Sequence, residues 1–277
     1  MKKYMFLFII VLSFGLIYWF GIRTVGKGTL PVITYHGISD QDPDHSEYII
    51  SNEKFEETIK ALKDADFTFL TLYDLDKLIS GEMELPKNPV FITFDDGYRN
   101  NYENAYPILK KYGAKASLFM VGSQLERPNF LTRSQIIEMA ESGVFAFGSH
   151  TYSLDGTFLD GANKGKTFLS SKLEGETDEE FYTKIKNDLV WNNDVVYNMS
   201  STFPNAIAYP GAMVNDIAKQ AVMDAGLKYG FIGANKTATK LKDLDPNNPE
   251  SLLEIHRFHI NPSTSVKNLV RFLQSNN

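Results

Sequence analysis

Residues 89–98 read PVFITFDDGY. An apolar run that ends in two adjacent acids and a glycine is typical of a buried parallel strand that presents Asp95 and Asp96 at its carboxyl end. Neighbouring carboxylates repel one another when both are ionised, and a nearby cation would keep both charged. The stretch therefore indicates one metal ligand and one general base. A turn that only caps the following helix explains the same letters equally well.

Two further strand ends carry a histidine. Residues 144–151 read VFAFGSHT and place His150 after an apolar run, and residues 33–37 read ITYHG and do the same for His36. Histidine is the commonest metal ligand, although a histidine that only bonds to the backbone stays an alternative at each position. The other three histidines have weaker contexts: His45, His256 and His259.

Asp155 follows His150 by five residues. Together with Asp96 and His150 it would form a metal-binding set of two carboxylates and one histidine. The alternative is a solvated acid in a loop. A fourth apolar run ends in the rigid turn Tyr209-Pro210-Gly211, which we expect to shape the floor of a pocket.

Short apolar runs alternate with amphipathic helical patterns along the chain. The expected strands are residues 31–35, 68–71, 89–94, 115–121, 144–149, 205–209, 227–232 and 253–258. Helical stripes lie between them, for example Phe55, Ile59 and Leu62, and Thr132 with Gln135 predicts a capping box. This alternation predicts an α/β fold, either a (β/α) barrel or a doubly wound sheet, with its site at the carboxyl ends of the strands. Residues 152–175 are predicted to form a loop over that site.

The composition limits the classes of partner. With 277 residues and 43% apolar content, the chain can bury the core of one α/β domain. A net charge of −6 leaves no basic excess for a phosphate backbone, which argues against a nucleic-acid partner. Because the chain has no cysteine, any metal must bind to histidine and carboxylate side chains.

The N-terminus predicts a membrane anchor. Lys2 and Lys3 precede residues 4–22, an uncharged stretch long enough to cross a bilayer, which ends at Arg23. The stretch ends in bulky residues and not in the small residues of a cleavage site, so we read an uncleaved anchor; a cleaved signal peptide is the alternative. We expect residues 1–23 to form a single-pass membrane anchor, 24–30 a linker and 31–277 an extracellular catalytic domain.

The order of these motifs resembles the polysaccharide deacetylase superfamily. The resemblance rests on Tyr35-His36, on TFDDG at 93–97, SHT at 149–151 and AYP at 208–210. YENAYPILKKY at 102–112 and AGLKYGF at 225–231 look most similar to the poly-N-acetylglucosamine deacetylases of the intercellular-adhesion type. The similarity extends over roughly residues 31–273.

The resemblance implies a distorted (β/α)7-type barrel that holds a divalent metal ion through an aspartate and two histidines. It implies that Asp95 is the catalytic base, that Asp96 and His150 are metal ligands, and that His36 is the catalytic acid. The ion would be zinc, with manganese, iron, cobalt or nickel as alternatives.

This chain departs from the family pattern at two places. Asp155 stands where the family has its second metal histidine, and we expect it to be the third ligand. The turn Tyr209-Pro210-Gly211 is one aromatic residue short, and we expect it to contribute the oxyanion pocket. Both departures bear on the rate of reaction and on metal preference.

The resemblance also implies a function. The protein would hydrolyse N-acetyl groups of an extracellular poly-N-acetylglucosamine-type polysaccharide, release acetate and support biofilm formation. Its partners would be this amino-sugar polysaccharide, the membrane and polysaccharide synthase machinery. Three alternatives stay open: a peptidoglycan or chitooligosaccharide deacetylase, a catalytically impaired glycan-binding protein on the same fold, and an interaction domain that uses the barrel as a scaffold.

Overall fold

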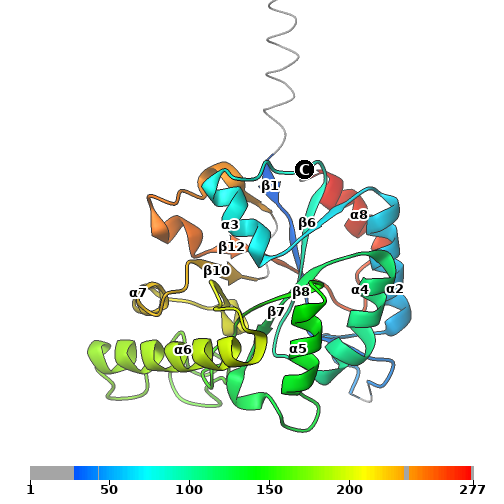
Figure 1. Cartoon of the computed structure of the whole chain (residues 1–277). Helices are drawn as coiled ribbons and strands as arrows, with labels where there is room; N and C mark the ends of the chain where they lie inside the picture. Colours follow the sequence, from blue (N-terminus) through cyan, green and yellow to red (C-terminus); the bar gives the residue numbers. More distant parts are fainter. Residues whose placement is uncertain (1–27, 43, 234–236, 276–277) are drawn as a thin grey trace, which may run out of the picture.

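A parallel sheet forms the centre of the molecule (Figure 1). The computed structural model describes residues 28–42, 44–233 and 237–275. The strand order is β12-β10-β9-β8-β7-β6-β2-β13, and β5 lies beside the first half of β6. The strands are β2 (Val32–Tyr35), β5 (Thr68–Leu70), β6 (Pro89–Phe94), β7 (Ala116–Met120), β8 (Phe145–Ser149), β9 (Ala206–Ala208), β10 (Tyr229–Ile232), β12 (Ile255–His256) and β13 (Phe258–His259).

One short segment touches both edges of this sheet. β12 pairs with β10, β13 pairs with β2, and only Arg257 separates β12 from β13. The chain thus crosses from one edge to the other, and the sheet forms a nearly closed parallel barrel. This confirms the predicted α/β barrel. The single strand expected at 253–258 is two strands, because the chain changes its pairing partner at Arg257.

Seven helices of the described chain surround the strands (Figure 1). They are α2 (Asn52–Asp64), α3 (Leu72–Ser80), α4 (Tyr106–Tyr112), α5 (Arg133–Glu141), α6 (Asp178–Ser200), α7 (Asp216–Asp224) and α8 (Val266–Ser275). The predicted stripe of Phe55, Ile59 and Leu62 is the buried face of α2. The predicted capping box is confirmed at the start of α5, where the Thr132 and Gln135 side chains bond to each other's backbone N–H groups.

Shorter elements connect the main ones. β1 (Thr29–Leu30) pairs with β11 (Thr239–Lys240), and β3 (Gly37–Ile38) pairs with β4 (Ile49–Ile50). The short helical turns are η1 (Asn101–Ala105), η2 (Gly122–Gln124), η3 (Pro210–Ala212), η4 (Leu241–Asp243) and η5 (Pro249–Leu252).

The predicted anchor lies outside the described residues, as does most of the predicted linker. β1 pairs with β11, and Leu30 in β1 is fully buried. Within the described part of the chain, no helix is long and apolar enough to span a membrane.

Candidate active site

A tight turn after β6 separates the two adjacent acids. Asp96 and Gly97 both have positive φ, 73° and 88°, and the Gly97 N–H donates to the Asp95 carbonyl at 2.9 Å. Left-handed backbone is uncommon for a residue other than glycine and occurs often at functional sites. As a result, the Asp95 side chain is only 4% exposed, whereas that of Asp96 is 21% exposed.

Asp95 forms a bidentate ion pair with Arg257. The guanidinium donates to Oδ1 at 2.7 Å and to Oδ2 at 2.8 Å, and both side chains are buried. Burial by itself would raise the pKa of the Asp95 carboxyl, but the positive charge of Arg257, followed by His150, holds that pKa well below its ordinary value. Asp95 is therefore ionised at neutral pH.

Arg257 is a site residue that the sequence reasoning missed. A signal was present, because Arg257 is the one arginine or lysine inside the apolar run expected at 253–258. Its guanidinium also donates to the hydroxyl of Thr34 at 3.2 Å. An arginine is almost never fully buried without a partner, so its position in a strand pattern predicts a buried carboxylate nearby.

Asp96 and His150 lie side by side at the ends of β6 and β8. His150 Nε2 is 3.5 Å from Asp96 Oδ1. His150 Nδ1 lies 2.8 Å from the carbonyl oxygen of Ala208, which can only accept, so Nδ1 is a donor and, in the neutral imidazole, Nε2 has the free lone pair. Burial raises the pKa of Asp96 to about 6, and the charge of Asp95 also raises it, while His150 and a hydrogen bond from Tyr98 oppose this shift.

This pair fits a divalent metal ion. A carboxylate oxygen and an imidazole nitrogen are ligands that zinc and its neighbours accept. The second nitrogen of His150 is held by a backbone carbonyl, which is how metal-binding histidines are usually oriented. A cation would also favour the ionised form of Asp96, which burial disfavours.

Asp155 is not gathered into the same cluster. It is partly exposed in the loop that follows His150, and its charge helps to raise the pKa of Asp96. Across residues 28–42, 44–233 and 237–275, no group of three His, Asp or Glu side chains lies close enough to hold an ion. The structure thus brings Asp96 and His150 together, and the role of Asp155 as third ligand stays a prediction.

His36 lies near Asp95. Its Nε2 is 3.9 Å from Asp95 Oδ2, and its ring contacts the rings of Tyr48 and His259 at centroid distances of 4.8 and 5.3 Å. Burial lowers the pKa of His36 to about 4, Asp95 opposes this shift, and His259 adds to it. His36 is therefore neutral at pH 7. The structure brings together His36, Asp95, Asp96 and His150 as the sequence predicts.

The turn after β9 offers one backbone donor. The Tyr209 N–H donates to the Phe231 carbonyl at 3.0 Å, and Pro210 has no N–H. The Gly211 N–H donates to no acceptor among the described residues. Of the three residues that the sequence assigned to the oxyanion pocket, Gly211 alone has a free N–H group.

The long loop packs against this turn. Residues 152–175 contain a single bridge between Thr157 and Thr167, and their irregular course was predicted. A β-carbon added to Gly211, which has a φ of 59°, would lie 2.8 Å from Thr167 Cγ2. The Asn215 side chain donates to the Ser170 carbonyl at 2.9 Å. A larger residue at 211 would require the Thr167 side chain or the loop to shift.

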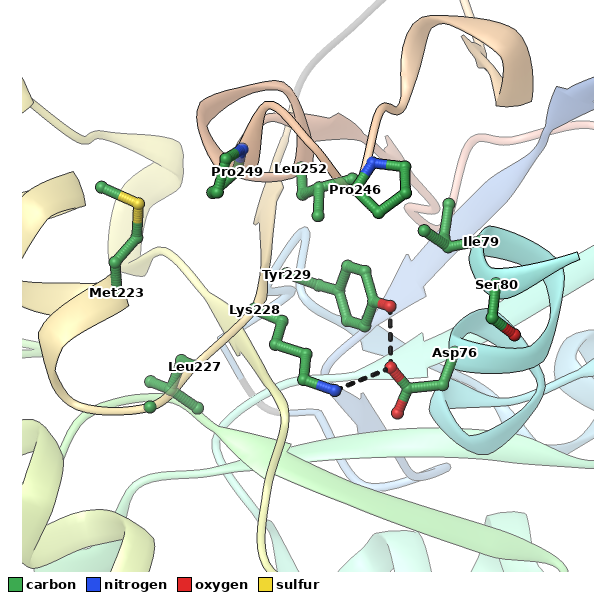
Figure 2. Close-up of a pocket in the computed structure, with 11 residues that line it drawn as sticks. Asp76, Ile79, Ser80, Met223, Leu227, Lys228, Tyr229, Pro246, Pro249 and Leu252 are labelled. Atoms are coloured by element: carbon green, nitrogen blue, oxygen red, sulfur yellow. Dashed lines mark hydrogen bonds and ion pairs between the residues drawn. The ribbon is translucent and has the colours of Figure 1, made fainter.

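A separate cavity of about 520 Å³ lies at the end of the barrel opposite the candidate site (Figure 2). There Asp76 of α3 accepts a hydrogen bond from the Tyr229 hydroxyl at 2.7 Å and pairs with Lys228 Nζ at 3.5 Å. Tyr229 is the first residue of β10, so this cavity is at the amino ends of the strands. The acids and histidines of the candidate site lie at the carboxyl ends.

Comparisons with known proteins show the family of this chain. Residues 82–230 match the family model described as polysaccharide deacetylase. The poly-beta-1,6-N-acetyl-D-glucosamine N-deacetylase of Staphylococcus epidermidis is 30% identical over 230 residues, which cover 77% of this chain and 75% of that protein.

Two solved structures share the fold. A de-N-acetylase from Aggregatibacter actinomycetemcomitans has a TM-score of 0.77 and 22% identity, over 88% of this chain and 99% of that one. IcaB from Ammonifex degensii has a TM-score of 0.73 and 23% identity, over 90% of this chain and 98% of that one. Because the family model matches more than half of the chain, the protein belongs to the polysaccharide deacetylase family and is a hydrolase that acts on carbon–nitrogen amide bonds.

Proposed function

We propose that this protein removes N-acetyl groups from an extracellular poly-β-1,6-N-acetylglucosamine-type polysaccharide in a metal-dependent reaction that releases acetate. The observation that carries the proposal is the ionised Asp95 beside the pair of Asp96 and His150. The name of the Staphylococcus epidermidis relative supports the choice of polymer.

The pair of Asp96 and His150 would hold the metal ion, with Asp155 as our proposed third ligand. When bound there, zinc, manganese, iron, cobalt or nickel supplies Lewis acidity toward the amide carbonyl. The remaining chemistry belongs to the side chains of this chain.

Asp95 takes a proton from the attacking water. The pKa of Asp95 lies well below its ordinary value, whereas that of His36 is about 4, so His36 is the stronger base of the two. His36 Nε2 lies 3.9 Å from Asp95 Oδ2, and it would receive this proton through a bridging water molecule. His36 then protonates the departing nitrogen, because an amine leaves poorly as an anion. These proton transfers give His36 the proton that it donates, although its imidazole is neutral at the start.

The Gly211 N–H would stabilise the oxyanion of the tetrahedral intermediate. It is a donor with no acceptor among the described residues, and backbone donors aimed at developing negative charge contribute strongly to acyl transfer. The fixed position of residue 211 against Thr167 supports this role.

The site would face away from a membrane. β1, at the top of Figure 1, lies at the amino ends of the strands, and the acids lie at the carboxyl ends. We propose that residues 1–23 anchor the protein and place the barrel outside the cell, where synthase machinery supplies the polymer. A deacetylated polymer gains positive charge and would adhere to acidic surfaces, as a biofilm requires.

Acetate release by the full chain in detergent tests this function. Poly-β-1,6-N-acetylglucosamine, chitooligosaccharides and peptidoglycan fragments should be compared with each added metal, with Asp95→Asn as the inactive control. We expect release from the first substrate only when a metal is present. Release from chitooligosaccharides or peptidoglycan alone would favour those substrates, and no release from any of them would favour a glycan-binding protein.

A further inference from the structure

A stacked pair of aromatic rings, of which one is exposed, lies close to the end of β8. The rings of Tyr152 and Trp191 are stacked with a centroid distance of 4.7 Å and an interplanar angle of 4°. Trp191 is 60% exposed although it belongs to the long helix α6. Tyr152 stands two residues after His150, so this aromatic platform of Tyr152 and Trp191 borders the candidate active site.

Helix α6 fixes the platform relative to His150. The Asp188 carboxylate accepts the N–H groups of Tyr152 and Ser153 at 2.8 and 2.9 Å. The Asn192 amide donates to the Ser149 hydroxyl at 2.8 Å. Asp188, Trp191 and Asn192 are spaced i, i+3 and i+4, so they lie on one face of the helix, and all three contact residues 149–153.

The inner face of the platform is closed. A β-carbon added to Gly122 would lie 2.8 Å from Tyr152 Cδ2 and would also clash with the Asn192 side chain. The Tyr152 ring therefore contacts Gly122 as well as Trp191. Because stacking covers one face of the indole, its 60% exposure leaves the other face open to solvent.

We propose that this platform is an outer subsite that binds a sugar ring of the polymer, one or more units away from the unit whose acetyl group is removed. A β-linked pyranose has a flat face of axial C–H groups, which packs on an open aromatic ring, and aromatic side chains carry large amounts of contact area at low entropic cost. A unit that has already lost its acetyl group also carries an ammonium, which aromatic faces attract. The subsite rests on the proposed function.

Another aromatic pair, Tyr197 in α6 and Phe203 just after it, lacks these features. Tyr197 is 51% exposed and its ring lies 6.4 Å from that of Phe203 at a tilted angle of 49°. Tyr197 lies near the C-terminal end of α6, and the chain continues from there to the amino end of β9. Tyr197 therefore lies toward the end of the barrel opposite the acids. Tyr197 therefore serves as a matched control for an exposed aromatic residue on the same helix.

Kinetics on β-1,6-linked N-acetylglucosamine oligomers of two and six units test the subsite in the full chain. We expect Trp191→Ala to raise KM for the hexamer about tenfold with kcat unchanged, and to leave the dimer unaffected because it does not reach the platform. Trp191→Phe should restore most of the affinity, and Tyr197→Ala should match wild type. Equal KM values for wild type and Trp191→Ala on the hexamer would overturn the subsite.

A binding measurement separates this outcome from failure of the proposed function. The chain has two tryptophans, so in Trp19→Phe the fluorescence comes from Trp191 alone. We expect the hexamer to change this fluorescence with saturation, and unchanged fluorescence up to millimolar hexamer would overturn the subsite. If wild type releases no acetate from any oligomer, the proposed function fails, and the fluorescence titration still decides whether the platform binds the sugar chain.

Discussion

The guanidinium of Arg257 donates two hydrogen bonds, of 2.7 and 2.8 Å, to the carboxylate of Asp95 at the point where the barrel closes. Arg257 is also the residue between β12 and β13, the two strands that join the edges of the sheet. The same residue therefore completes the fold and holds the proposed base. Stability and activity should depend on it together.

Removal of this guanidinium should strongly destabilise the protein. Arg257→Met leaves the Asp95 charge buried without a partner, so we expect the free energy of unfolding to fall by about 3–5 kcal/mol, as measured by urea denaturation. Asp95→Asn in the same chain should recover part of the loss. Lys60→Met, which removes an exposed ion pair with Asp64, should leave the urea midpoint unchanged. A loss in Arg257→Met no larger than in Lys60→Met would contradict the buried pair.

The two adjacent acids should respond differently to removal of their charge. Asp96→Asn should lose bound metal, whereas Asp95→Asn should keep it and lose a factor of ~10²–10⁴ in turnover, because only Asp95 acts as base. Metal content by elemental analysis and acetate release are the two measurements. Equal metal content and equal activity in both variants would show that these roles are wrong.

His36 should make stability depend on pH. Its pKa is about 4 in the folded protein and about 6.5 when unfolded, so between these values the unfolded chain binds more protons at this position. Its contribution to the free energy of unfolding should therefore rise by about 3 kcal/mol from pH 4 to pH 6.5 and be lost again as the pH falls. The difference between wild type and His36→Gln, measured by urea denaturation with a chelator present, isolates this contribution from that of Asp96. Parallel curves for the two proteins would contradict a buried neutral His36.

Asp155 should weaken the Lewis acidity of the metal if it is a ligand. Two carboxylates and one neutral histidine bring a +2 ion to zero formal charge, so the rate optimum should be more alkaline than at a site with neutral ligands, where zinc-bound water has a pKa of ~7. Asp155→His should raise activity with zinc or cobalt and shift the optimum downward. A pH–rate profile and metal analysis check both changes. Full metal occupancy and an unchanged profile in Asp155→Ala would exclude Asp155 as a ligand.

A chain that begins at Gly26 should be soluble and folded. It keeps β1, whose Leu30 is fully buried and whose partner is β11. Circular dichroism and acetate release should match those of the full chain in detergent. Aggregation of the shortened chain, together with activity of the full chain, would show that the boundary is wrong.

The local pattern of the sequence determined most of the strands, the helix cap at Thr132 and the strand ends that carry four reactive side chains. Each of these features is encoded within about ten residues: an apolar run predicts a buried strand, and a polar residue after it lies at the strand's carboxyl end. Because parallel strands end at one edge of a sheet, Asp95, Asp96, His150 and His36 were expected at the same end of the barrel.

Only the tertiary structure decided which residues complete the site. Arg257 and Asp95 are 162 positions apart, and they meet because the last strands close the barrel at Arg257. The packing of α6 stacks Trp191 on Tyr152. Such contacts depend on which edge closes the sheet and on the paths of loops, and no periodicity within a short stretch of sequence encodes either of them.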